Sequence, residues 1–533
     1  EADRESARRR NGHGNAIAQG YNHVILPLCN ERDRRTQVRW GVADFRRRFR
    51  REPESLWLPE TACDDATLET LIEEGLKYVI LSPFQAERVR PVSGDSEWRT
   101  VSDGSVDTSV PYNYFHRDRS GRSIAVFFYD GHISKAIAFD GLLASSRALV
   151  DRFERAAANG ASIVSVATDG ETYGHHYRFG ELCLAHALEV EAEARGFRVT
   201  NYGEFLASHP PASEVEIKQG PEGKGTAWSC SHGVGRWSSD CGCHAGTHAN
   251  WNQKWRAPLR AALDLLRDDA ARKFETAGGD LFRDPWAARD AYVELLFDEN
   301  VSQATEDFLR RHASRTLRPF ERERALKLLE LQRGAMVMYT SCGWFFDDIS
   351  GLEAVQVLRY AGHTIELMDE LELVPPRAAF LEILAEARSN AARMGNGADV
   401  FARADEASRA AARHTASHDL RPKQGEEGKA EKIFESVAEE LITKAVRSAV
   451  RSPSTDGFAK ALAWVELARR LGRDDFLSRA QEIVYEAVGG GPPVSEELRA
   501  LATALRLAPC LLVTSQDICS GGAEASPSDA TLA

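Results

Sequence analysis

Residues 55–82 read SLWLPETACDDATLETLIEEGLKYVILS, which is two short apolar runs separated by an amphipathic stretch. The runs at 55–59 and 77–82 are short and apolar, as buried strands are. Residues 66–74 between them carry a helical pattern of apolar residues. A strand, a helix and a second strand in this order predict two parallel strands, because a parallel connection needs a crossover of helix length.

The same alternation extends on both sides of this stretch. Apolar runs rich in branched and aromatic residues lie within 15–28 and at 124–129 and 162–168, and residues 141–159 carry a helical pattern. Buried strands that alternate with helices build a parallel sheet covered by helices, in a layer or a barrel. The sequence therefore predicts an α/β domain over residues 1–211.

The character of the sequence changes after residue 211. Residues 212–256 are rich in Gly, Cys, His and Trp without a clear period, which predicts a long structured loop. Residues 257–510 are dominated by Ala, Leu, Glu and Arg with a helical period, so we expect an all-α domain there. Residues 511–533 have the small and polar composition of a disordered tail.

Composition narrows the class of protein. Of the 533 residues, 43% are hydrophobic and 28% are charged, as in ordinary globular proteins. The net charge of −13 disfavours nucleic acid as a partner, since an acidic surface repels phosphates. We see no apolar run long enough to span a membrane and no secretory pattern. Nine cysteines are too few for a disulfide framework, so we expect a cytoplasmic protein. The oligomeric state stays open.

Two carboxylates stand where a parallel α/β fold places its active site, at the carboxyl ends of strands. Glu60 ends the run SLWLPE, and Asp169 follows the run at 162–168. A carboxylate that stays ionised and a second one that holds a proton are the equipment for glycoside hydrolysis. The alternative is structural, because an Asp after a strand often caps the next helix.

Four segments, taken in order, resemble glycoside hydrolase family 57, whose members act on α-glucans with retention of configuration. The segments are AIAQGYNHVILPL at 16–28, QVRWGVADFRRRFRREPESLWLPE at 37–60, ATDGETYGHH at 167–176 and YTSCGWFFDDISG at 339–351. The last segment, the Cys- and Trp-rich loop and the helical part are similar to the subgroup that carries domain of unknown function 3536. This resemblance implies a (β/α)7-type barrel followed by helices.

The resemblance also assigns roles. It makes Glu60 the nucleophile and Asp169 the general acid/base. It places His23 and Trp57 near the sugar and makes Trp344 a stacking platform, and the tryptophans of the 212–256 loop would add further platforms. Glu171, His175 and His176 would serve sugar hydroxyls, and no metal or organic cofactor is implied.

Two departures from the family pattern stand out. The family's first region has no counterpart, because the chain begins at Glu1, where the family's second region is already near. We therefore expect an N-terminally truncated barrel without its first strand, whose activity is an open question. In the last segment the family commonly has an Asp before the Trp, where this chain has Gly343.

The loop carries a cluster of possible metal ligands. They are Cys230, His232, Cys241, Cys243, His244 and His248. The spacings C-x-H and C-x-C match no standard zinc knuckle, in which C-x2-C is usual. We therefore expect the loop to pack on its own tryptophans, and the sequence leaves zinc binding open.

The sequence predicts a retaining glycoside hydrolase or transglycosylase, similar to α-amylases and 4-α-glucanotransferases, with an α-glucan or maltooligosaccharide substrate. Two alternatives remain. A metal-dependent polysaccharide deacetylase would use Asp169, His175 and His176 as ligands, and a non-catalytic glucan-binding protein would need none of these roles. The sequence does not decide between hydrolysis and transfer. It also leaves open the glycosidic linkage and the chain length of the substrate.

Overall fold

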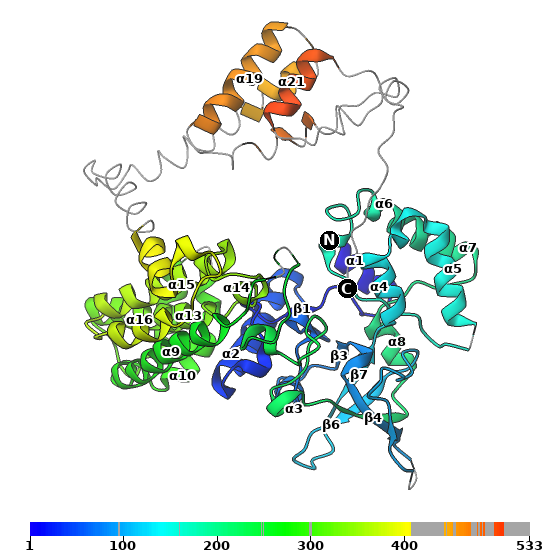
Figure 1. Cartoon of the computed structure of the whole chain (residues 1–533), viewed down its shortest axis with the longest axis horizontal. Helices are drawn as coiled ribbons and strands as arrows, with labels where there is room; N and C mark the ends of the chain where they lie inside the picture. Colours follow the sequence, from blue (N-terminus) through cyan, green and yellow to red (C-terminus); the bar gives the residue numbers. More distant parts are fainter. Residues whose placement is uncertain are drawn as a thin grey trace. The chain divides into compact units, whose positions relative to one another are not determined.

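We describe a computed structural model of the chain (Figure 1). It describes residues 1–406, apart from 94, 95, 159, 247, 249 and 298–300, and parts of 442–505. The chain divides into two units, Glu1–Arg413 and His414–Ala533. The expected tail at 511–533 lies outside the described residues. No helix among the described residues is long and apolar enough to cross a membrane.

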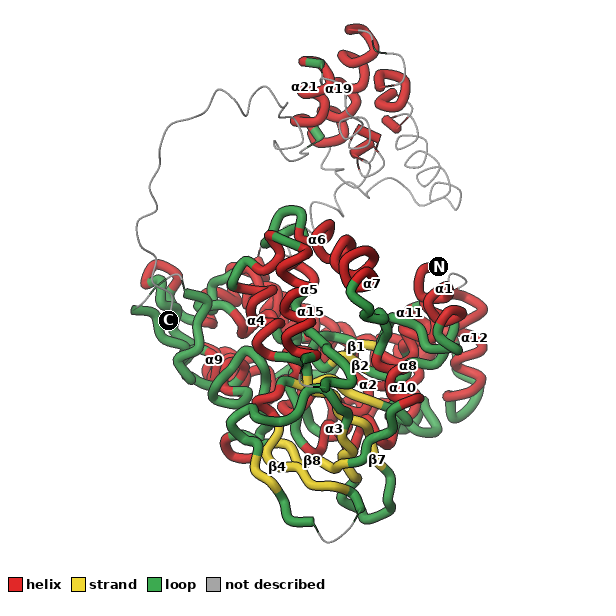
Figure 2. Tube along the Cα trace, turned by 90° about the vertical axis from the view of Figure 1, so that its right-hand side faces the viewer, coloured by secondary structure: helices red, strands yellow, loops and turns green. Residues whose placement is uncertain are grey.

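Two sheets carry the strands of the first unit, and Figure 2 shows their strands in yellow. The two-stranded sheet pairs β1 with β2 in parallel, and the larger sheet has the order β3-β7-β6-β8-β4-β5. The strands are β1 Ala18–Gln19, β2 Leu56–Trp57, β3 Tyr78–Leu81, β4 Ala86–Pro91, β5 Arg99–Thr100, β6 Tyr112–Phe115, β7 Ser123–Phe128 and β8 Ser213–Ile217. A parallel bridge from Ser55 to Tyr78 and the parallel pairing of β3 with β7 extend the order β1-β2-β3-β7.

The predicted strands at 55–59, 77–82 and 124–129 are present as β2, β3 and β7, but the sheet is mixed. β6 and β7 are antiparallel, because the short loop from His116 to Arg122 joins them as a hairpin. β4 pairs antiparallel with both β5 and β8. The described strands therefore form two sheets, one of them mixed, and not a closed ring of parallel strands.

Two expected elements were wrong. Residues 162–168 form no strand, because their backbone bond to the neighbouring chain is a single one, from Asp130 N to Ser165 O, and not a ladder. The expected loop at 212–256 begins with β8. Within 15–28, strand structure is limited to β1, and Leu26–Leu28 form a 3-10 turn.

Helices lie beside the sheets and follow them along the described residues of the first unit (Figure 1). Those up to residue 211 are α1 Ala2–Arg9, α2 Glu31–Phe49, α3 Asp65–Glu73, α4 Gly131–Phe139, α5 Ser146–Ala157, α6 Gly180–His186, α7 Ala192–Ala194 and α8 Tyr202–Ser208. The later ones are α9 Arg256–Gly278, α10 Pro285–Ala291, α11 Val293–Leu296, α12 Val301–His312, α13 Pro319–Val337, α14 Cys342–Phe345, α15 Leu352–Glu370 and α16 Arg377–Ala385. The second unit contributes α19 Thr455–Arg470 and α21 Glu496–Ala504, which pack on each other.

Helix α2 joins the strands to the later helices. Its buried Trp40 donates from Nε1 to the carbonyl of Asp290 at 2.9 Å. Arg289 of α10 is fully buried and donates to Asp33 of α2 at 2.6 Å and to Thr36 at 2.6 Å. A buried guanidinium needs such partners, since an unpaired buried charge is costly. One continuous apolar core therefore runs from β1 and β2 into α9, α13 and α15.

Gly41 lets α2 lie directly against β1. A Cβ atom at this position would sit 1.9 Å from the carbonyl oxygen of Gln19. Gly41→Ala forces the helix and strand apart, so we expect it to cost about 1–3 kcal/mol, as overpacking in a core does. Scanning calorimetry should show a lower melting temperature. Gly279→Ala is the control, because its Cβ would meet its nearest atom at 3.4 Å. Equal melting temperatures for the two variants would contradict the packing described here.

Candidate active site

Glu60 lies in a strained turn directly after β2. Pro59 begins a 3-10 turn over Pro59–Thr61, in which Glu60 has φ 59° and Thr61 has φ 49°. Left-handed backbone in residues other than glycine costs of order 1–3 kcal/mol, and it persists where neighbours hold it. Gln85 donates to the carbonyl of Thr61 at 2.8 Å, and the backbone N–H of Trp228 donates to the carbonyl of Glu60 at 3.0 Å. The turn is therefore held from two other segments.

The carboxylate of Glu60 is fixed by the Trp-rich loop. Trp228 donates from Nε1 to Oε2 of Glu60 at 3.0 Å, and the hydroxyl of Ser229 donates to the same oxygen at 2.5 Å. Within the described residues, Oε1 of Glu60 has no hydrogen-bond partner, and the side chain is half-buried. One carboxylate oxygen is therefore held by two donors, and the other accepts no hydrogen bond from the described residues.

Asp169 follows the extended segment after residue 161 and precedes the 3-10 turn Gly170–Thr172. Its side chain makes no capping hydrogen bond, so the structural alternative from the sequence finds no support. Loss of water around the carboxyl raises the pKa of Asp169, and the negative charges of Glu60 and Glu171 raise it further. His23 and His176 act in the opposite direction and lower this pKa. Asp169 and Glu60 are thus close enough for their charges to interact.

His23 connects this site to the helical part of the unit. Its backbone is left-handed, with φ 55°, and its Nδ1 lies 2.7 Å from the hydroxyl of Ser341. The N–H of Ser341 donates to the carbonyl of His23 at 2.9 Å. Cys342 follows, and its pKa is raised by burial and then by the charge of Glu60. Segments around residues 23, 60, 169 and 341 therefore meet at one place.

Comparison with protein families finds two regions of the chain that match known families. Residues 6–218 match the model of glycosyl hydrolase family 57, and residues 251–437 match the domain of unknown function DUF3536. Residues 6–218 therefore carry a glycosyl hydrolase family 57 domain. This assignment confirms the family and the enzyme class that the motifs predicted, together with the subgroup carrying DUF3536.

One solved structure shares the fold at low identity, and two further ones align with lower scores. The exo-type maltose-forming amylase of Pyrococcus sp. ST04 is 16% identical with a TM-score of 0.52, over 71% of this chain and 66% of that one. The 4-alpha-glucanotransferase of Thermococcus litoralis has a TM-score of 0.40 at 14% identity, over 68% and 49% of the two chains. The branching enzyme of Thermococcus kodakaraensis has a TM-score of 0.37 at 17% identity, over 69% of this chain and 71% of that one. The chain thus spans about two thirds of the amylase. A comparison with curated protein sequences found no match.

The predicted stacking role of Trp344 was wrong. Its side chain has no exposed surface and lies parallel to the ring of Tyr339, with Arg260 over its face. Its Nε1 donates to the carbonyl of Arg256 at 3.3 Å. A sugar cannot reach a fully buried ring. The loop tryptophans Trp237 and Trp255 are buried as well, with 0% and 1% of their surface exposed.

Other predicted substrate residues remain reachable. Trp57 is half-buried at the end of β2, with its ring centroid 5.4 Å from that of Trp228. Glu171, His175 and His176 are exposed beside Asp169, and the two imidazole rings are 5.0 Å apart. Their contact with a sugar stays a prediction.

Among the described residues, Asp169, His175 and His176 do not bring three ligand atoms together, so the deacetylase alternative gains no support. One group in the described part of the chain does so: Cys230, His232, Cys241 and Cys243. His244 and His248 lie outside it. His244 accepts from the N–H of Gly246, and the ring of His248 is tilted against that of Trp251 with the centroids 4.0 Å apart.

The sequence missed the contacts that hold Glu60. Trp228 and Ser229 are 168 and 169 positions away from it, and neither lies in a family segment quoted above. Ser341 and Cys342 lie in the YTSCGWFFDDISG segment, but in that segment the resemblance assigns a role to Trp344 alone. The density of Trp in the loop was the available signal.

The raised pKa of Asp169 has a consequence for stability. Because the folded state holds this proton more tightly than the unfolded chain does, ionisation of Asp169 destabilises the fold as the pH rises through the raised pKa. Asp169→Asn should therefore melt at a higher temperature than the wild type at pH 7. The difference should vanish below the ordinary carboxyl pKa of about 4.

Asp118→Asn provides the control of opposite sign. Hydrogen bonds from Ser120 and then Arg122 lower the pKa of Asp118, which favours its ionised form in the folded state. This variant should melt at or below the wild-type temperature at pH 7. A stabilised Asp118→Asn or a destabilised Asp169→Asn would show that the described electrostatics are incorrect.

Proposed function

We propose that this chain is a retaining glycoside hydrolase or transglycosylase that acts on α-glucans, with Glu60 as nucleophile and Asp169 as general acid/base. The observation that carries the proposal is the unequal environment of two interacting carboxylates. Glu60 is held by two hydrogen-bond donors, whereas burial and the charge of Glu60 raise the pKa of Asp169. Two carboxyl groups in unequal environments are the arrangement that glycosidases use.

In the first step Oε1 of Glu60 attacks the anomeric carbon. The carbon–oxygen bond of the glycosidic link breaks, and Asp169 transfers its proton to the departing oxygen. Trp228 and Ser229 keep Oε2 in place, so the free oxygen is the one aimed at the sugar. The products of this step are a glycosyl ester of Glu60 and a released glucan end.

In the second step Asp169, now ionised, removes a proton from water or from the hydroxyl of an acceptor sugar. The resulting oxygen attacks the anomeric carbon and displaces Glu60 as a carboxylate. Two inversions leave the configuration unchanged. Water as acceptor gives hydrolysis, and a sugar hydroxyl as acceptor gives transfer.

The match of residues 6–218 to glycosyl hydrolase family 57 supports an α-glucan substrate. The amylase of similar fold supports it too, since that enzyme forms maltose. Trp57 and the half-buried Trp228 offer aromatic faces beside Glu60, on which apolar sugar faces stack. His23, His175 and His176 carry ring nitrogens that can bind sugar hydroxyls.

The domain arrangement is proposed on the same basis. The parallel order β1-β2-β3-β7 supports a partial (β/α)7-type barrel over residues 1–211. The bonds from Trp228 and Ser229 to Glu60 support a role of the 212–256 loop in covering the site. The helical part after residue 256 contacts the site through Ser341, whose hydroxyl lies 2.7 Å from Nδ1 of His23. The cytoplasmic location stays a prediction.

Azide rescue tests the roles of the two carboxylates. Wild type should shorten or rearrange maltoheptaose, and Glu60→Ala should lose turnover by about 10⁴-fold or more while still binding glucan, because the nucleophile acts in the transition state. Azide should rescue Glu60→Ala with an activated α-glucoside and give the β-glycosyl azide. Asp169→Ala should give the α-glycosyl azide, since its nucleophile is intact.

Product stereochemistry, measured by NMR, separates the outcomes. The opposite pair of anomers would mean that the two roles are exchanged. Wild-type chain that binds maltoheptaose without any product would favour the non-catalytic alternative. Full activity in both variants would exclude these carboxylates from the chemistry.

Removing the donor of Trp228 tests the orientation of Glu60. Trp228→Phe keeps a ring beside Trp57 but deletes the Nε1–H that binds Oε2. A hydrogen bond to a charged group contributes about 1.5–3 kcal/mol, so kcat should fall about 10- to 100-fold. Trp251→Phe is the matched control, because Trp251 packs on His248 instead. Equal kcat values for both variants would refute the orienting role.

A further inference from the structure

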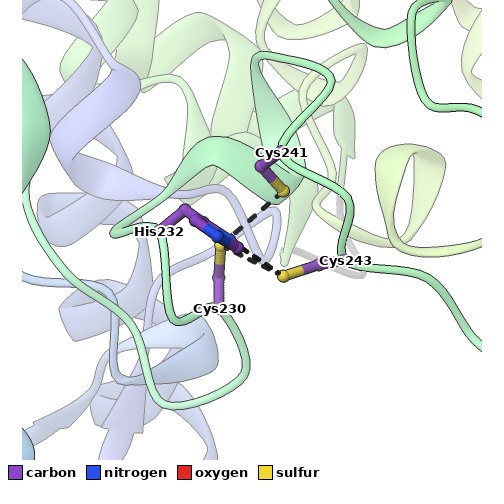
Figure 3. Close-up of side chains that lie close together, drawn as sticks. All are labelled: Cys230, His232, Cys241 and Cys243. Carbon is purple, nitrogen blue, oxygen red and sulfur yellow. Dashed lines mark hydrogen bonds between the residues drawn. The ribbon is translucent and has the colours of Figure 1, made fainter.

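Four metal-ligating side chains converge in the loop that holds Glu60. The Sγ atoms of Cys230, Cys241 and Cys243 and a ring nitrogen of His232 all lie within 4.8 Å of one another (Figure 3). Sγ of Cys230 is 3.9 Å from Sγ of Cys241 and 3.8 Å from Sγ of Cys243. Nδ1 of His232 is 3.5 Å from Sγ of Cys243.

These separations match the edges of a zinc tetrahedron. With Zn–S distances of about 2.3 Å and Zn–N distances of about 2.0–2.1 Å, tetrahedral geometry places two sulfurs about 3.8 Å apart and a sulfur and a nitrogen about 3.5 Å apart. A disulfide would need sulfurs about 2.05 Å apart, and all three cysteines are free. From this geometry we propose that Cys230, His232, Cys241 and Cys243 bind one Zn²⁺ ion.

The surroundings provide for the charge of such a site. Three thiolates, a neutral imidazole and Zn²⁺ carry a net charge of −1. The guanidinium of Arg256 is fully buried and donates to Sγ of Cys241 at 3.9 Å and to the carbonyl of Cys243 at 3.0 Å. Donors that bind ligating groups orient them and stabilise their charged form. A buried cation against the cluster fits an anionic metal site better than three neutral thiols.

The local backbone explains how an unusual spacing makes the site. Cys230 and His232 are separated by one residue, and so are Cys241 and Cys243. The chain turns within each pair, at residues 231–234 and at Gly242, and the two ligand atoms of each pair lie close together there. Gly242 has φ +82°, a left-handed conformation that glycine adopts without strain. The C-x-H and C-x-C spacings, which match no standard zinc knuckle, therefore give two pairs of ligands.

Four protein ligands leave no open position, so the ion is structural and not catalytic. Its place in the chain gives it an effect on the active site, and this part rests on the proposed function. Trp228 and Ser229, which hold Oε2 of Glu60, directly precede Cys230. Zinc fixes the end of this segment, and its loss should release the hold on Glu60.

Metal content tests the site directly. Full-length protein produced with added zinc should contain about one zinc per chain by mass spectrometry of metals. Cys230→Ser and Cys243→Ser should each lose the ion, and Cys183→Ser, outside the group, should retain it. A wild type without zinc, or zinc retained by both ligand variants, overturns the proposal.

Cobalt substitution keeps the test independent of how the variants fold. Wild-type protein stripped of metal and loaded with Co²⁺ should show sulfur-to-cobalt charge transfer in the near ultraviolet and strong visible bands of tetrahedral cobalt. The absence of these bands overturns the site.

Activity is a separate readout. Metal-free wild type should show a fall in kcat similar to that of Trp228→Phe, and added zinc should restore it. Zinc binding with unchanged kcat would overturn the link to Glu60 alone. A chain without turnover in any state would refute the proposed function and leave the metal result standing.

Discussion

The left-handed turn at Glu60 and Thr61 is the constraint on which the rest of the site depends. Two consecutive residues other than glycine adopt positive φ there, and one of them is β-branched. Such a backbone costs of order 1–3 kcal/mol per residue and relaxes unless other contacts hold it. Here the contacts are hydrogen bonds from Gln85 and from Trp228. The strain turns the carboxylate away from the path of the strand and toward the loop that fixes it.

The site is assembled from segments that are far apart in the chain. His23, Glu60 and Asp169 come from the N-terminal region, the donors to Glu60 come from the loop, and Ser341 comes from the helical part. None of these segments positions the others without the shared core that α2 builds between β1 and α10. The stability of the first unit and the geometry of the site are therefore linked.

The sequence predicted β2, β3 and β7 but not β4, β5, β6 and β8, each of which pairs antiparallel with a neighbouring strand. The run at 77–82 became β3 because its four central residues are all buried. Residues 162–168 have similar composition, but their neighbour is the beginning of α4, which offers no free strand edge. The family segments located Glu60 and Asp169. They could not locate Trp228, because a contact across 168 positions leaves no periodic signal in one sequence.

The last family segment, at 339–351, shows why a motif transfers place more safely than role. It reaches the site, as expected, but through Ser341 on His23, while Trp344 turns inward. The buried indole still needs an acceptor for its N–H, and finds it in the carbonyl of Arg256. The guanidinium of that arginine in turn donates to Cys241, in the loop whose earlier residues hold Glu60. The buried aromatic side chain is thus linked to the loop that holds Glu60, through packing and two hydrogen bonds, instead of presenting an exposed face.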